Sequence, residues 1–142
     1  MILVDTNLLV CAHISSAREH ARAKAWLDER LSDSTRVGLP WQSILGYLRV
    51  ATNRRIFPNA PSLETAWAQT QNWLACPNVW IPTPGPDAPE ILGRMLVHAR
   101  AGANLIPDAA LAALAVEHGL TLCSNDGDFA RFTGLKWMNP LA

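Results

Sequence analysis

Short apolar runs alternate along this chain with longer segments in which apolar residues recur every three or four positions. A short apolar run is typical of a strand buried on both faces, as in a parallel sheet. The longer spacing is typical of a helix with one buried face. We therefore predict five strands, and their residues in chain order are Met1–Val4, Thr35–Leu39, Val79–Ile81, Leu120–Cys123 and Leu135–Met138.

Helices are predicted between these strands. The apolar positions Trp41, Ile44, Leu45, Leu48 and Ala51 have helical spacing. Pro107 and Asp108 suit the first turn of a helix, and Gly119 suits its end. The predicted helices begin after Asp5 and at Trp41, and further ones span Ala17–Leu31, Leu63–Leu74, about Pro89–Ala101 and Ala109–His118, with a single turn over Phe129–Phe132. Alternating strands and helices predict an α/β layered fold with a mainly parallel central sheet.

Three acids occupy related places in this pattern. Asp5 follows the first strand, Asp126 follows the fourth, and Asp108 begins the helix just before the fourth strand. Ligands of such sheets bind beyond the carboxyl ends of the strands. In a parallel sheet Asp5 and Asp126 emerge at the same edge, and the topology allows Asp108 to reach it.

A cluster of three carboxylates needs a counter-ion. Each pair at ~4 Å repels by about 4 kcal/mol at an effective dielectric constant near 20. Oxygen ligands without His or Cys indicate Mg²⁺ or Mn²⁺ rather than zinc. Such a site is typical of phosphoryl chemistry, in which the ion activates water and stabilises charge on the phosphate oxygens.

Each acid also has an ordinary structural interpretation. Asp5 and Asp108 stand where helix caps are common, and Asp126 stands in a turn. Asp128 is either a further ligand or a helix cap. We expect Asn7 to share the face of Asp5 if the strand geometry continues, and to orient Asp5 through a hydrogen bond.

Composition narrows the possibilities only a little. The 142 residues suit one domain. A net charge of +0 argues against binding nucleic acid through overall charge, although a local basic patch remains open. Arg49, Arg54 and Arg55 are candidates for contacts with RNA phosphates, or else lie on a solvated helix face. The tryptophans are expected in the core or at an interface.

The remaining features indicate a cytoplasmic protein. The spacing of Cys11, Cys76 and Cys123 matches no disulfide framework or metal motif, so buried free thiols are expected. The N-terminal run has no basic segment before it, so we do not expect a signal peptide. No apolar stretch approaches the ~20 residues of a membrane-spanning helix.

Three segments in order resemble the PIN-domain ribonucleases, and among them the VapC toxins of VapBC toxin–antitoxin systems. ILVDTNLLV resembles the opening strand followed by D-x-N. LPWQSILGYLRVATNRRIF resembles the central helix of VapC toxins. IPDAALAALAVEHGLTLCSNDGDFARFTGLKWMNP resembles the second half of the domain, with its helix-opening Asp and its D-x-D-F turn. The resemblance covers essentially the whole chain.

The resemblance implies a three-layer α/β/α PIN-like domain over residues 1–142 that acts as a metal-dependent endoribonuclease. It implies Asp5, Asp108 and Asp126 as ligands of Mg²⁺ or Mn²⁺, with Asp128 as an additional candidate. It also implies a VapB-type antitoxin as partner, a homodimer, and a structured RNA of translation, tRNA or rRNA, as substrate.

Gln42 departs from the family pattern, because VapC sequences usually have Glu in the segment that reads LPWQS here. Gln keeps a carbonyl oxygen but lacks the charge, so metal affinity and proton acceptance should weaken. Natural drift, a silenced enzyme and an introduced substitution all remain open explanations. The second hypothesis is therefore a PIN scaffold that binds RNA or antitoxin without efficient cleavage. A receiver-like or phosphatase-like domain is disfavoured, because no suitable acid follows the predicted strand Val79–Ile81.

Overall fold

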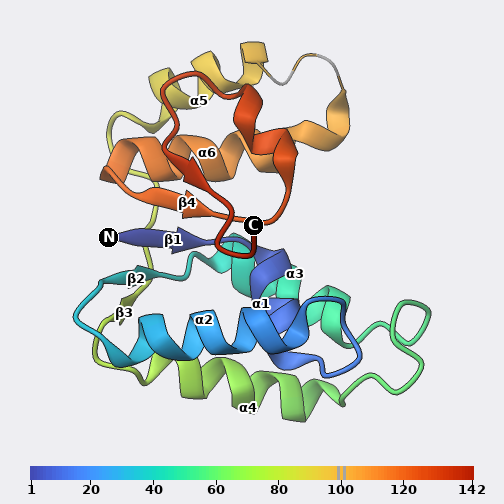
Figure 1. Cartoon of the computed structure of the whole chain (residues 1–142). Helices are drawn as coiled ribbons and strands as arrows, with labels where there is room; N and C mark the ends of the chain where they lie inside the picture. Colours follow the sequence, from blue (N-terminus) through green and yellow to red (C-terminus); the bar gives the residue numbers. More distant parts are fainter. Residues whose placement is uncertain (99, 101) are drawn as a thin grey trace.

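The computed structural model describes residues 1–98, 100 and 102–142. Within these residues five strands form one sheet in the order β3-β2-β1-β4-β5, and all its neighbouring strands are parallel (Figure 1). Their bounds are β1 Ile2–Val4, β2 Val37–Gly38, β3 Val79–Trp80, β4 Thr121–Cys123 and β5 Trp137–Met138. The predicted parallel α/β fold is confirmed.

Helices cover both faces of the sheet, which makes three layers. Helices α1 to α4 lie on one face, and α5 and α6 lie on the other (Figure 1). The α-helices are α1 Thr6–His13, α2 His20–Ser32, α3 Trp41–Ala51, α4 Leu63–Leu74, α5 Ala88–His98 and α6 Ile106–His118, and the short 3₁₀ helices are η1 Ala103–Leu105 and η2 Gly127–Arg131.

The sheet separates two apolar cores because successive side chains of a strand point to opposite faces. Ile2 and Val4 pack in the core beneath α1 to α4, whereas Leu3 packs in the core beneath α5 and α6. In β4, Cys123 joins the first core and Leu122 the second. This explains why an unbroken apolar run, rather than an alternating one, encodes the central strand β1.

Several predicted boundaries differ from the structure. Helix α2 begins at His20 rather than Ala17. The backbone N–H groups of Ala17 and His20 donate to carbonyls three residues earlier, as in turns, and Glu19 adopts a left-handed conformation at φ 66°. Left-handed backbone interrupts a helix, and the apolar pattern does not signal it. Helix α5 is described to His98, and residues 99 and 101 at the predicted end of this helix lie outside the described residues.

The buried face of α3 also differs from the predicted one. Ser43, Ile44, Tyr47 and Ala51 are buried, whereas Trp41 and Leu45 are 45% and 59% exposed. The apolar spacing therefore identified the helix correctly but chose part of the wrong face.

The other predictions about single residue types hold in part. Cys123 is buried, but Cys11 and Cys76 are only partly buried, and all three are free thiols. Trp73 lies in the core, whereas Trp67 is 40% exposed. No helix within the described ranges combines the length and apolar character needed to cross a membrane.

Candidate active site

Strands β1 and β4 lie side by side at the point where the connections of the sheet change direction. From β1 the chain adds β2 and β3 on one side, and β4 and β5 then follow on the other side. In an open parallel sheet a crevice forms at such a switch point, beyond the carboxyl ends of the strands. Asp5 directly follows β1, and Ser124 to Asp126 directly follow β4. The two loops that leave these strands therefore open onto one crevice.

Two helices bring further side chains to the same edge. Helix α6 leads into β4, so it runs antiparallel to the strands and begins at their carboxyl edge with Asp108 in its first turn. Helix α3 leaves β2 at that edge, with Gln42 in its first turn. Gly46 lets α3 approach the start of α1 closely, because a Cβ at this position would collide with the Thr6 hydroxyl. The Thr6 hydroxyl also donates to the Ser43 carbonyl oxygen at 3.1 Å.

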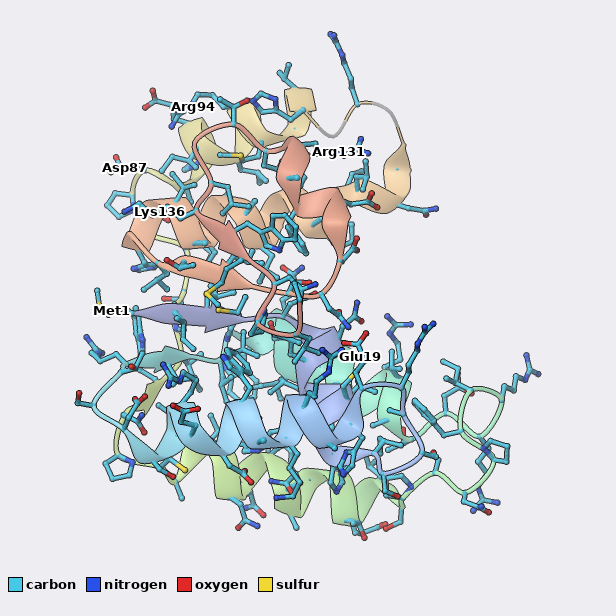
Figure 2. The ribbon with its side chains drawn as sticks, in the orientation of Figure 1. Met1, Glu19, Asp87, Arg94, Arg131 and Lys136 are labelled. Atoms are coloured by element: carbon cyan, nitrogen blue, oxygen red, sulfur yellow. The ribbon has the colours of Figure 1, made fainter. Side chains whose placement is uncertain are left out.

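The resulting cavity has a volume of about 390 Å³. Its predicted lining residues are Asp5, Asn7, Gln42, Arg49, Asp108, Asp126 and Asp128, and Thr6, Gly46, Val50, Asn104, Leu105 and Pro107 complete the wall. Figure 2 shows Glu19 and Arg131 at the carboxyl edge of the sheet and Met1 at the opposite edge. The structure thus brings together the acids that the sequence predicted from distant segments.

Asp5 is the most firmly held of these acids. It caps α1, and its Oδ1 accepts from the Thr6 backbone N–H at 2.8 Å. Its Oδ2 accepts from the Ser124 hydroxyl at 2.7 Å. The Ser124 Oγ in turn accepts from the Asp126 backbone N–H at 3.0 Å. One buried serine therefore links the acid after β1 to the loop after β4.

The other three acids form a tight group, which we call the outer acids because it includes the exposed Asp128. One carboxylate oxygen from each of Asp108, Asp126 and Asp128 lies within 4.8 Å of the others. The Asp126 Oδ1 accepts from the Asp128 backbone N–H at 2.9 Å, so Asp126 caps η2. Asp128 is exposed and pairs with Arg131 at 3.8 Å. Asp128 therefore belongs to this group of acids, whereas the sequence left open whether it is a metal ligand or a helix cap.

Asp5 and Asp108 are partly buried and close to other acids, which disfavours their charged forms. The pKa of Asp108 is raised to about 6, first by burial and then by repulsion from Asp126, Asp5 and Asp128. Burial also raises the pKa of Asp5, although its hydrogen bonds from Ser124 and Thr6 oppose this effect. Carboxylate oxygens at this spacing match the donor set that hard divalent cations prefer. The residues present therefore fit a Mg²⁺ or Mn²⁺ ion.

Gln42 bonds to the helix that carries Asp108. Its Nε2 donates to the Pro107 carbonyl oxygen at 2.6 Å. A glutamate side chain has only acceptors when ionised, so it cannot make this bond. Gln42 thus joins the first turns of α3 and α6 across the cavity, which is a contact specific to the amide.

Two features of the site differ from the sequence analysis. Asn7 lies in α1 rather than in extended backbone, and the described hydrogen-bond partners of the Asp5 carboxylate are Thr6 and Ser124. The predicted bond from Asn7 to Asp5 is therefore wrong, because the helix begins at once after Asp5. Sequence reasoning missed Ser124, whose only signal was its place directly after a strand and two residues before Asp126.

The three predicted RNA-contacting arginines lie in different places. Arg49 lines the acidic cavity. Arg54 and Arg55 are exposed on the turn that follows α3. In the part of the chain that the structure describes, none of the three forms an ion pair.

Comparisons with known proteins agree on one family. The sequence matches the PIN-domain family over residues 2–135. It is 42% identical to Ribonuclease VapC37 of Mycobacterium tuberculosis over 142 residues, which covers 100% of this chain and 99% of that one. The structure of VapBC2 from Rickettsia felis, bound to a DNA fragment from their promoter, is similar with a TM-score of 0.70 at 16% identity and 98% coverage of both chains. Mycobacterium tuberculosis VapC20, a sarcin–ricin loop cleaving toxin, is similar with a TM-score of 0.69 at 19% identity, with 96% of this chain and 99% of that chain covered.

Proposed function

The chain belongs to the PIN-domain family and within it to the VapC group, and from this premise we propose that it is the toxin of a type II toxin–antitoxin pair and a Mg²⁺- or Mn²⁺-dependent endoribonuclease. The observation that carries the proposal is the single cavity in which Asp5, Asp108, Asp126 and Asp128 meet. A relative with 42% identity over the full chain is named a ribonuclease, which supports the same reaction class.

Each residue has a distinct role in this proposal. Asp108, Asp126 and Asp128 would hold the ion, and Asp5, which lines the same cavity, would complete its ligand set. The bound ion supplies activation of water and stabilisation of charge on the scissile phosphate. Ser124 is a positioning residue, because its hydroxyl orients Asp5 and receives the Asp126 N–H. Arg49 faces the same cavity and offsets the charge of an incoming phosphate.

The proposed substrate is a structured RNA of translation, tRNA or rRNA. The proposed partner is a VapB-type antitoxin, with the toxin as a homodimer in the cytoplasm. The support for these points is the VapC resemblance, the VapBC2 complex among similar structures, and the sarcin–ricin loop activity named for VapC20.

The decisive experiment is an RNA cleavage assay with the purified chain. Total tRNA and intact ribosomes are incubated with Mg²⁺, Mn²⁺ or EDTA, and the products are separated on denaturing gels. We expect discrete fragments with either ion and none with EDTA or with the Asp126→Asn variant. Cleavage that persists unchanged in EDTA and in Asp126→Asn would contradict the proposed metal site.

A second candidate function follows from the bond between Gln42 and Pro107. In this alternative the chain is a PIN scaffold that binds RNA or antitoxin without efficient cleavage. The same assay separates the two, because a scaffold leaves all RNAs intact while its Gln42→Glu variant cuts them. Fragments from the wild-type chain would remove this alternative.

A further inference from the structure

Two further hollows lie beside the acidic cavity, so that the surface has three in a row. Asn7 lines both the acidic cavity and a middle hollow of about 270 Å³, whose wall includes Arg18 and Phe57. Ser16 lines both the middle hollow and an outer pocket of about 370 Å³. Each hollow shares a lining residue with the next, and we call this row of three hollows the α1 groove.

The length of the α1 groove follows from the helix beneath it. Asn7 lies near the start of α1, and His13, which lines the outer pocket, is its last residue. Six residues of α-helix span ~9 Å. This corresponds to the rise of roughly two to three stacked nucleotides at ~3.4 Å each.

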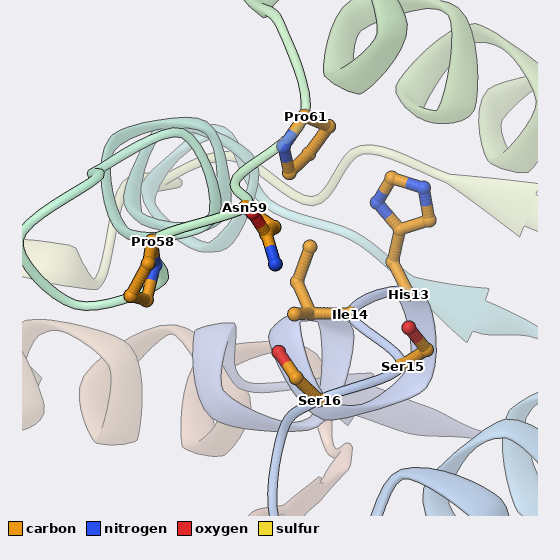
Figure 3. Close-up of a pocket in the computed structure, with 7 residues that line it drawn as sticks. All are labelled: His13, Ile14, Ser15, Ser16, Pro58, Asn59 and Pro61. Atoms are coloured by element: carbon orange, nitrogen blue, oxygen red, sulfur yellow. The ribbon is translucent and has the colours of Figure 1, made fainter.

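The outer pocket combines the flat ring of His13 and the apolar side chains of two prolines and Ile14 with hydrogen-bonding groups. Pro58, Asn59 and Pro61 of the loop after α3 line one side of the pocket, and His13, the last residue of α1, and Ile14 line the other, with the Asn59 amide pointing toward Ile14 (Figure 3). Ser15 and Ser16 lie below Ile14 in the same view. Unpaired nucleobases are recognised by such sets, in which a ring stacks on a flat side chain and an amide or hydroxyl bonds to its edge.

The His13 ring is held rigidly at this place. Its Nδ1 shares a hydrogen bond of 2.6 Å with the hydroxyl of the buried Tyr47. Trp73 packs edge-on against both rings. Burial lowers the pKa of His13, with a further contribution from His20, which favours the neutral imidazole. A neutral, fixed ring suits stacking on a base better than pairing with a phosphate.

Arginine side chains border the acidic cavity and the middle hollow that lies between it and the outer pocket. Arg49 borders the acidic cavity and Arg18 the middle hollow, and neither forms an ion pair within the described residues. Arg54 and Arg55 are exposed on the same loop that carries Phe57 and Pro58. Glu19 also lines the middle hollow, but Arg22 lies 3.5 Å from its carboxylate. Neutralising phosphates with arginines is the main source of affinity for nucleic acid.

We propose that the α1 groove guides single-stranded RNA away from the acidic cavity and that the outer pocket receives one unpaired base. This inference rests on the proposed ribonuclease function and specifies where the flanking nucleotides lie. Arginines beside these hollows favour a polyanion over an apolar protein segment, and the ring and amide groups of the outer pocket favour an unpaired base over an acidic segment. Binding of the antitoxin in the same groove is therefore treated as an outcome of the test.

The test is RNA binding as a function of length. Fluorescein-labelled RNAs of two, four and eight nucleotides are titrated with the protein and followed by anisotropy in Ca²⁺, which accepts the same oxygen ligands. Ser16→Trp fills the junction of the middle hollow and the outer pocket, and Asn59→Ala removes the amide. Ser34→Trp and Asn72→Ala are matched controls, since both residues are exposed and neither lines the groove.

We expect the wild-type chain and both controls to bind the octamer more tightly than the dinucleotide. Asn59→Ala should weaken octamer binding by about threefold to tenfold, the effect of one hydrogen bond. Ser16→Trp should weaken it by about tenfold or more, the effect of one stacked base. Both losses should shrink as the RNA becomes too short to reach the pocket.

Three results overturn the inference and differ in what else they contradict. If Ser16→Trp and Ser34→Trp bind the octamer equally while the wild type cleaves RNA, the groove assignment alone is wrong. If Ser16→Trp leaves RNA binding intact but abolishes binding of a VapB-type antitoxin, the groove belongs to a protein partner. If the wild type neither binds nor cleaves RNA of any length, the proposed function is wrong as well.

Discussion

The inner and outer acids of the cavity are held in different ways. Asp5 lies at the junction of β1 and α1, and both of its carboxylate oxygens accept hydrogen bonds from the protein. Asp108, Asp126 and Asp128 crowd within 4.8 Å of one another, and Asp128 is exposed on a short turn. The geometry of Asp5 is therefore set by the fold, whereas the geometry of the outer acids depends on what neutralises them. Substitutions of Asp5 or of its hydrogen-bond partner should therefore change the geometry of the site. Substitutions of Asp108, Asp126 or Asp128 should change how activity and stability depend on ions and pH.

Removing the charge of Asp5 should have the largest effect on catalysis. We expect Asp5→Asn to lose more than about a hundredfold in RNA cleavage, beyond the usual 10–100-fold effect of outer-shell partners. Stability should rise slightly at neutral pH, because burial raises the pKa of this acid and so disfavours its charged form. Cleavage kinetics and urea unfolding measure the two quantities, with exposed Asp28→Asn on α2 as control. If Asp5→Asn loses activity only because it unfolds, the expectation that cleavage falls while stability is kept is wrong.

Removing the serine that orients Asp5 should reduce both activity and stability. Ser124→Ala leaves Oδ2 of Asp5 and the backbone N–H of Asp126 without their partner. We expect a 10–100-fold loss of cleavage and a loss of about 1–3 kcal/mol in the free energy of unfolding. Ser43→Ala is a matched control, because the Ser43 hydroxyl is also buried but has no partner within the described residues. Equal effects of the two substitutions would remove the positioning role.

Introducing at position 42 the acid that the resemblance implies should lower stability without metal and raise cleavage with metal. Gln42→Glu loses the bond to Pro107 and adds a negative charge beside the outer acids. In EDTA we expect a loss of about 1 kcal/mol in stability, since one hydrogen bond is removed. With saturating Mg²⁺ or Mn²⁺ we expect higher cleavage, by roughly tenfold, and a higher Tm than in EDTA. Equal activity of both forms at saturating metal would show that position 42 does not contribute to the ion site.

The sequence predicted the central framework well because its signals are local. Helix α4 was predicted with its observed bounds, Leu63–Leu74, and Ser62 caps its first turn. Strands β1 and β4 followed from apolar runs, since a strand buried on both faces has little room for polar residues. The start of α2 was missed because left-handed backbone at Glu19 leaves no trace in apolar spacing.

The candidate site was only partly accessible from the sequence. Asp5 and Asp126 followed from the rule on carboxyl ends, and Asp108 from the helix that leads back to β4. The role of Ser124 was hidden, because a serine after a strand usually marks a turn. The bond from Gln42 to Pro107 joins segments 65 residues apart in sequence, and only the folded chain brings them together. Side-chain partners across such distances have no sequence pattern.

The pH dependence of stability should report on Asp108. The pKa of Asp108 is raised to about 6 in the folded protein, against an ordinary value of 3.8. Between these two values the folded state binds more protons than the unfolded state, so stability should fall as pH rises through this window. In EDTA we therefore expect the free energy of unfolding to decrease from pH 4 to pH 6 and the Asp108→Asn variant to lack most of this decrease.

Saturating Mg²⁺ should reverse the trend above pH 6, with a gain of about 2.7 kcal/mol at a hundredfold excess over Kd. Urea unfolding at several pH values measures both effects. If Asp108→Asn and the wild type have the same pH profile, other groups cause the pH dependence of stability.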